Sequence, residues 1–236
     1  MNKVERMQAV FAGQEPDRVP AGFWFHYPQG LSLEERAQAH VDLCRSVGTD
    51  IIKIMDDNFG RFFTQDIRIE KASDWRHIRL PGKDCVHYRH MTGLIQRILD
   101  KSGGEAMVFP TMWSPFKIAS FTYTDGGGTD QQFMAHCKED PASVLEGVRA
   151  LTETLQEWAR DYLELGSSGL YYSGQFSEPQ RFSEEEWARL VKPSDLAVLE
   201  VTKKIPGKYN IVHICGEMEF GFQSSPRRYA GYPGDL

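Results

Sequence analysis

The sequence predicts an α/β fold of the (β/α)8 TIM-barrel type, because strand-like and helix-like segments alternate along the chain. Residues able to do chemistry stand at the carboxyl ends of several different strands. A barrel gathers such residues at one mouth, whereas an open doubly wound sheet gathers them at a single crevice. The five expected strands are residues 22–27, 51–55, 107–112, 170–174 and 211–215.

The first half of the chain supplies the early units of this alternation. Residues 2–14 have apolar positions on one helical face and end near Gly13. Residues 32–48 form a second expected helix, with Ser32 as N-cap, Glu35 three residues on and Gly48 at the end. The segment 61–89 has short alternating runs, which predict a hairpin.

The second half continues the same pattern with longer helices. Residues 92–104 read as a helix closed by glycines. Residues 130–169 contain two helices broken at Pro141, and residues 182–205 contain a helix that starts at a Ser183 cap and is interrupted near Pro193. The stretch after residue 215 has no clear period. We therefore expect one domain, residues 1–236, that is a C-terminally incomplete barrel with about five or six βα units.

Composition excludes several classes of protein. The chain is 41% hydrophobic and 25% charged, with a formal net charge of −6 and no basic run, so nucleic acid is not an expected partner. No apolar stretch is long enough for a membrane span, and the charged start lacks the apolar region of a signal peptide. The four cysteines are widely spaced without a CxxC pair, which predicts reduced thiols and a cytoplasmic location.

Nucleotide-binding motifs are also missing. The chain has no GxGxxG after the first strand and no P-loop sequence. The stretch "DGGGTD" at 125–130 lacks the lysine of a P-loop and predicts a flexible loop.

The stretch "NIVHICGE" at 210–217 is the strongest chemical signal. Residues i and i+2 of a strand point to the same side, so His213 and Cys215 would both face the barrel mouth. Imidazole and thiolate are zinc ligands, and catalytic zinc sites keep one position open. On spacing alone, a buried cysteine beside a hydrogen-bonded histidine explains the same pattern.

Several stretches, in order, resemble the uroporphyrinogen decarboxylase-like superfamily, which includes cobamide-dependent methyltransferases. Residues 6–26, containing "PDRVP", resemble the family opening, and residues 46–57 resemble its second strand. Residues 169–200 resemble a family strand and the helix after it, and "NIVHICGE" resembles the H-x-C-G strand of the methyltransferase branch. The resemblance covers roughly residues 2–220.

The resemblance implies a set of site residues. Asp56 stands where the decarboxylases place a catalytic aspartate, and Ser173 stands where they place a polar substrate contact. His213 and Cys215 match the first two zinc ligands of the methyltransferases, whose third ligand, a cysteine, would lie beyond residue 236. The remaining expected substrate-binding residues are His26, Asp57, Trp113, Tyr172 and Gln175.

Each of these residues also has a structural explanation. Asp57 could cap a helix or begin a solvated loop. His26 could be a surface histidine, and one of the two tyrosines 171 and 172 is expected to pack in the core with its hydroxyl satisfied. Trp113 could be packing at the core or rim.

Three functions follow from this comparison. The first is zinc-dependent methyl transfer between a corrinoid carried on a partner protein and a thiol. The second is decarboxylation of a tetrapyrrole, although "FHYPQG" lacks the arginine that the decarboxylases use to hold substrate carboxylates. The third is an inactive truncated fragment, whose unpaired strand edge would favour a homodimer.

Overall fold

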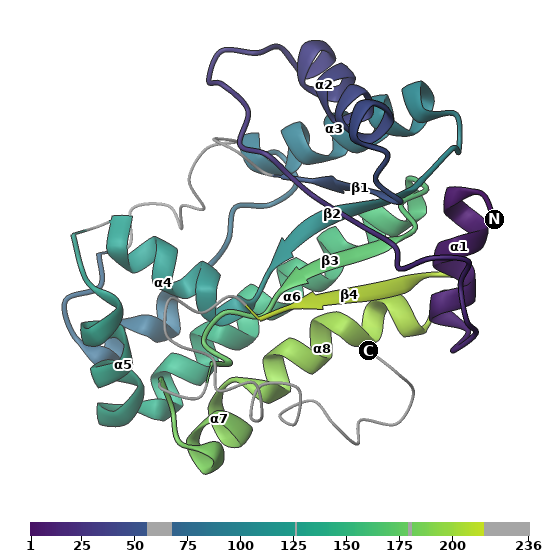
Figure 1. Ribbon diagram of the computed structural model, residues 1–236. Helices are drawn as coiled ribbons and strands as arrows, with labels where there is room; N and C mark the ends of the chain where they lie inside the picture. The colour runs from purple at the N-terminus through teal and green to yellow at the C-terminus, as the bar shows by residue number, and fades with distance from the viewer. Residues whose placement is uncertain (56–67, 126, 179–180, 215–236) are drawn as a thin grey trace.

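A four-stranded parallel sheet forms the centre of the molecule, with strand order β1-β2-β3-β4 (Figure 1). The computed structural model describes residues 1–55, 68–125, 127–178 and 181–214. The strands of these residues are β1 (Ile51–Ile54), β2 (Met107–Trp113), β3 (Gly169–Ser173) and β4 (Tyr209–His213). Within the described ranges the sheet is open, as expected for an incomplete barrel.

The helices return the chain between successive strands, as parallel pairing requires. In chain order they are α1 (Lys3–Phe11), α2 (Leu33–Val47), the 3-10 helix η1 (Ala72–His77), α3 (Val86–Ser102), α4 (Pro115–Asp125), α5 (Asp130–Glu139), α6 (Pro141–Glu164), α7 (Glu184–Leu190) and α8 (Lys192–Lys203). None of them is long and apolar enough to cross a membrane.

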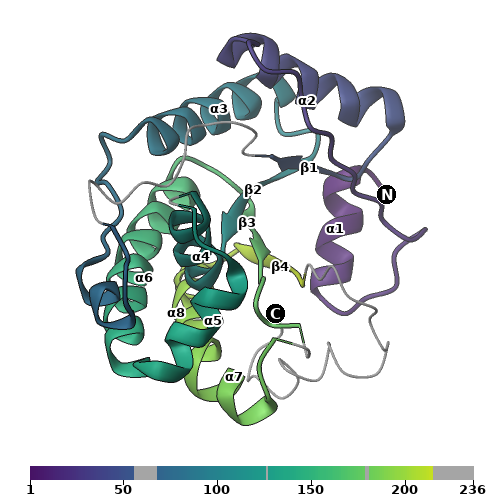
Figure 2. The same ribbon diagram turned by 90° about the vertical axis from the view of Figure 1, so that its left-hand side faces the viewer.

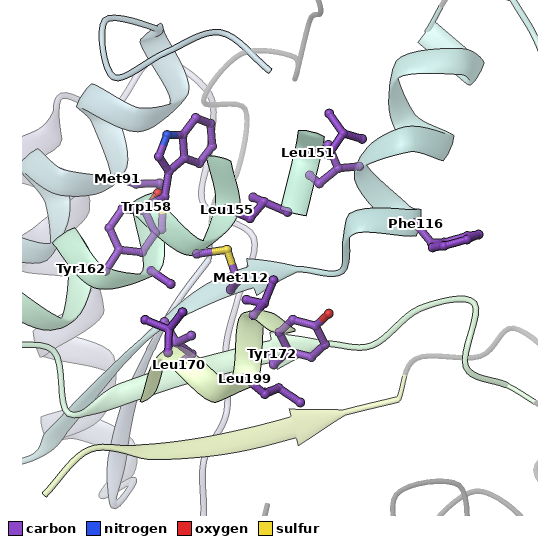
Figure 3. Packing of buried hydrophobic residues seen from close by; sticks show 14 of the residues in the cluster. Met91, Met112, Phe116, Leu151, Leu155, Trp158, Tyr162, Leu170, Tyr172 and Leu199 are labelled. Atoms are coloured by element: carbon purple, nitrogen blue, oxygen red, sulfur yellow. The ribbon is translucent and has the colours of Figure 1, made fainter. Parts of the chain in front are cut away.

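Helices cover the two faces of the sheet unequally (Figure 2). The outer face carries Ile52, Val108 and Leu170 and packs against α2, α3, α6 and α8. Figure 3 shows Leu170 among the core side chains. The inner face carries Ile51 and Phe109, and α1 covers its N-terminal part. The carboxyl-terminal part of the inner face is therefore left for a site.

Capping signals in the sequence are confirmed. Ser32 and Glu35 form a capping box at α2, and Gly48 ends that helix with a φ of 74°. Helix α5 ends at Glu139 and α6 begins at Pro141, as the proline predicts.

Two expected elements are absent from the part of the chain that the structure describes. Residues 22–27 form no strand. Just before them, Ala21 is joined to Asp50 by a backbone bond, Asp50 N to Ala21 O at 2.7 Å, and the Ala21 N–H donates to the Asp50 side chain. No hairpin occurs in the described part of 61–89, where η1 stands instead.

Asp50 is a fully buried carboxylate that joins three segments. It accepts hydrogen bonds from Arg6 of α1 at 2.6 Å and from Arg18 at 2.8 and 2.9 Å. Burial alone would raise the pKa of Asp50, but the Ala21 N–H and both guanidinium groups outweigh it, so the pKa lies below its usual value. Arg6 also binds Asp17 with two hydrogen bonds, at 2.6 and 2.9 Å.

Replacing Asp50 by Asn should destabilise the fold by roughly 3 kcal/mol, because two arginines lose their shared buried partner. Since the pKa is lowered by folding, this stabilisation is present above the ordinary Asp range and is lost as the pH falls through the folded pKa. Urea unfolding at several pH values would measure both effects. The exposed Asp100→Asn is the control; equal losses in the two variants would contradict the role of Asp50.

Candidate functional site

The ends of three strands lie at one level at the mouth of the sheet. In the strand register, Trp113 is opposite Ser173, and Ser173 is opposite His213. Two backbone bonds join these ends: Ser114 N to Ser173 O at 3.0 Å, and Gly174 N to His213 O at 2.8 Å. The expected residues Ser173 and His213 are therefore neighbours on a rigid framework.

Three side chains on the inner face form a compact cluster with His213. The Lys53 ammonium lies 3.6 Å from the ring centroid of Trp24 and 4.1 Å from that of Tyr171. The His213 ring lies 5.9 Å from each of these two rings. The cluster therefore joins the segment before α2 to strands β1, β3 and β4, and we call it the Lys53 cluster.

His213 is half-buried in this cluster. Burial lowers the pKa of its imidazole, and the positive charge of Lys53 lowers it further. The neutral imidazole, which is the form that binds metal ions, is thus favoured at neutral pH.

The loop after β3 holds the next expected residue, Gln175. The Ser114 hydroxyl donates a hydrogen bond to the backbone carbonyl of Gln175 at 3.0 Å. The following residue, Phe176, has a φ of 69°, which is unusual for a bulky residue. Its ring is fully buried against Phe116 and Phe133, and this burial offsets the cost of the backbone conformation. Gln175 itself is half-buried at the mouth.

Tyr172 lies on the other face of the sheet from Ser173 and His213. Its hydroxyl donates to the buried Asp195 at 2.7 Å, and Asp195 also accepts from Ser177 at 3.2 Å. The ring packs in the core against α8 (Figure 3). Tyr172 is therefore the core tyrosine of the pair, and Tyr171 is the one that reaches the inner face.

The remaining expected residues have varied positions. Trp113 is half-buried and packs edge-to-face on Phe121 of α4, with ring centroids 5.3 Å apart. His26 is exposed on the segment that follows Trp24. Asp56, Asp57 and Cys215 lie outside the described residues. Among the residues that are described, no three His, Cys, Asp or Glu side chains are grouped to hold a metal ion.

Sequence reasoning missed Lys53, Tyr171 and Trp24 as site residues. One signal was available: a lysine within the apolar run "IIKIM" is rare in a buried strand unless the lysine has partners. Trp24 gave no such signal, because "FWF" reads as packing.

The geometry can be compared with known proteins. The family model for uroporphyrinogen decarboxylase (URO-D) matches residues 54–225, which is more than half of the chain. The chain therefore belongs to the URO-D family.

Among solved structures, a methyltransferase from Methanosarcina mazei is similar, with a TM-score of 0.69 and 14% sequence identity. The match covers 92% of this chain and 70% of that one. At this identity the likeness shows a shared fold. None of the curated proteins matches the sequence.

Replacing Tyr172 by Phe should destabilise the protein by about 1–3 kcal/mol, because Asp195 loses a buried donor. Ligand binding at the mouth should be unchanged, since the hydroxyl lies on the outer face. Thermal unfolding and a binding assay would measure the two effects. Tyr209→Phe is the matched control; a binding defect specific to Tyr172→Phe would contradict this placement.

Proposed function

We propose that the chain acts in methyl transfer between a corrinoid carried on a partner protein and a thiol, with zinc held by His213 and Cys215. The observation that carries the proposal is the position of His213: a half-buried imidazole of lowered pKa at the strand end, opposite Ser173. Membership of the URO-D family and the shared fold with a methyltransferase support it.

The donor chemistry fits zinc in part. His213 supplies a neutral imidazole, and the sequence has the Cys215 thiol two residues further along, close enough in the chain to serve as a second ligand. The nearby Lys53 ammonium adds positive charge, which a cysteine thiolate would offset. Bound zinc would lower the pKa of a thiol substrate and so supply a nucleophile near neutral pH.

The protein's own residues would bind and orient the acceptor. The buried Ser173 and the half-buried Gln175 flank Gly174 at the strand end, and both carry hydrogen-bonding groups. Trp24 and Tyr171 lie on the inner side of the sheet, with their ring centroids 6.2 Å apart. Asp56 and Asp57, which follow β1, keep their expected roles in catalysis and substrate binding within this proposal.

The first test is the zinc content of the purified chain. We expect nearly stoichiometric zinc in the wild type and its loss in His213→Ala and in Cys215→Ala, because each change removes a ligand. His77→Ala and Cys85→Ser should keep the metal, since neither residue belongs to the site. Inductively coupled plasma mass spectrometry gives the measurement. Equal zinc in all five proteins, or none in a folded wild type, would refute the proposed ligand pair.

One finding favours a second candidate, decarboxylation of a carboxylated tetrapyrrole: the chain belongs to the URO-D family. This reaction would not need zinc and would depend on Asp56 and Ser173. Turnover of uroporphyrinogen by chelator-treated protein, reduced in Ser173→Ala, would establish the second candidate in place of the first.

A further inference from the structure

The thiol of Cys44 is in contact with an amine from a distant part of the chain. The Lys3 Nζ lies 3.1 Å from the Cys44 Sγ, and it also donates a hydrogen bond to the Cys44 backbone carbonyl at 3.0 Å. Lys3 is the first residue of α1, whereas Cys44 is in the last turn of α2, 41 residues further along the chain. The packing of these two helices therefore brings an amine and a thiol together.

The surroundings hold this pair in position. The two contacts with one residue restrict the Lys3 nitrogen, and the Cys44 thiol donates to the Thr49 carbonyl at 3.4 Å. Cys44 is only 1% exposed, and Lys3 is half-buried. Because the fold buries the sulfur, large reagents are kept away from it, and a small oxidant such as hydrogen peroxide reaches it through local openings of the structure.

We propose that Lys3 and Cys44 form a reversible covalent cross-link between α1 and α2 when the protein meets a peroxide. In the first step, the Cys44 sulfur attacks the O–O bond of the peroxide, which gives a sulfenic acid and one water. In the second step, the deprotonated Lys3 amine attacks the sulfur, the S–O bond breaks, and the hydroxyl group leaves as a second water with a proton from the nitrogen. The product is a sulfenamide: the sulfur is oxidised by two electrons, and the peroxide is reduced by two.

The cross-link fixes α1 in the place that the ion pairs already give it. One turn after Lys3, Arg6 of the same helix binds the buried Asp50. A covalent bond between residues 3 and 44 restricts the unfolded chain as a disulfide does. Two molecules of a thiol reductant reverse it, because they break the N–S bond, become a disulfide and restore the amine and the thiol. The inference is independent of the proposed function, since neither residue belongs to the proposed site.

The first test is peptide mapping of the full chain after treatment with hydrogen peroxide. Endoproteinase Glu-C cuts after Glu5 and Glu35, so the cross-link joins residues 1–5 to the fragment 36–70. We expect a species with the summed mass of the two peptides less two hydrogens, because the amine and the thiol each lose one. Dithiothreitol should convert this species back to the separate peptides.

Matched variants separate the cross-link from simple oxidation. Lys3→Arg keeps the positive charge but has no nucleophilic amine, so it should give no joined peptide. Cys44→Ser removes the sulfur and should give none either. Cys85→Ser should give as much joined peptide as the wild type, since Cys85 is a free thiol outside the pair.

Thermal unfolding gives a second readout on the same proteins. The oxidised wild type should unfold roughly 5–10 °C above the reduced wild type, because the cross-link restricts the unfolded chain. Dithiothreitol should remove the gain. Lys3→Arg, treated with peroxide in the same way, should show no gain, and circular dichroism confirms that the variant is folded.

The form in which Cys44 is recovered decides the outcome. If the treated wild type contains Cys44 only as a free thiol, a sulfinic acid or a disulfide, without the joined peptide, the inference is overturned. An equal yield of joined peptide in the wild type and in Lys3→Arg would also overturn it.

Discussion

The arrangement of the inner face depends on the buried carboxylate of Asp50. Asp50 is the residue directly before β1. Its carboxylate binds Arg6 from α1, Arg18 from the following loop and the Ala21 N–H. These bonds place α1 over one part of the inner face and bring Trp24 over another. The helix covers the N-terminal hydrophobic side chains, and the tryptophan becomes a wall of the site. The ion pairs of Asp50, at the N-terminal end of β1, thus help to position Trp24, a side chain of the candidate site.

The two faces of the sheet have different roles: the outer face packs in the core, and the inner face carries the candidate site. Alternation along β3 directs Tyr172 to Asp195 in the core and Tyr171 to Lys53 in the site, although the two are adjacent in sequence. The same alternation along β1 separates Lys53 from Ile52 and Ile54, which pack against the helices. A buried ammonium is costly unless it has favourable partners, and the electron-rich rings supply part of that compensation.

Much of the fold could be predicted from local patterns. The caps at Ser32 and Ser183 and the break at Pro141 depend on interactions within a few residues, so the sequence shows them directly. The strand expected at residues 22–27 was wrong for the opposite reason. Its aromatic run is typical of a strand, but the segment forms no ladder, and Asp50, far away in sequence, binds the backbone just before it at Ala21.

The sequence by itself determined the order of β1 to β4 and of the main helices between them, and it placed Ser173 and His213 at strand ends, because periodicity and spacing are local properties. The family followed from the resemblance of several stretches in order. Only the tertiary structure decided that Trp24, Lys53, Tyr171 and His213 meet, since they come from four separate segments. Their meeting depends on strand register and on the Asp50 ion pairs. These link residues far apart in the chain, and no local pattern encodes them.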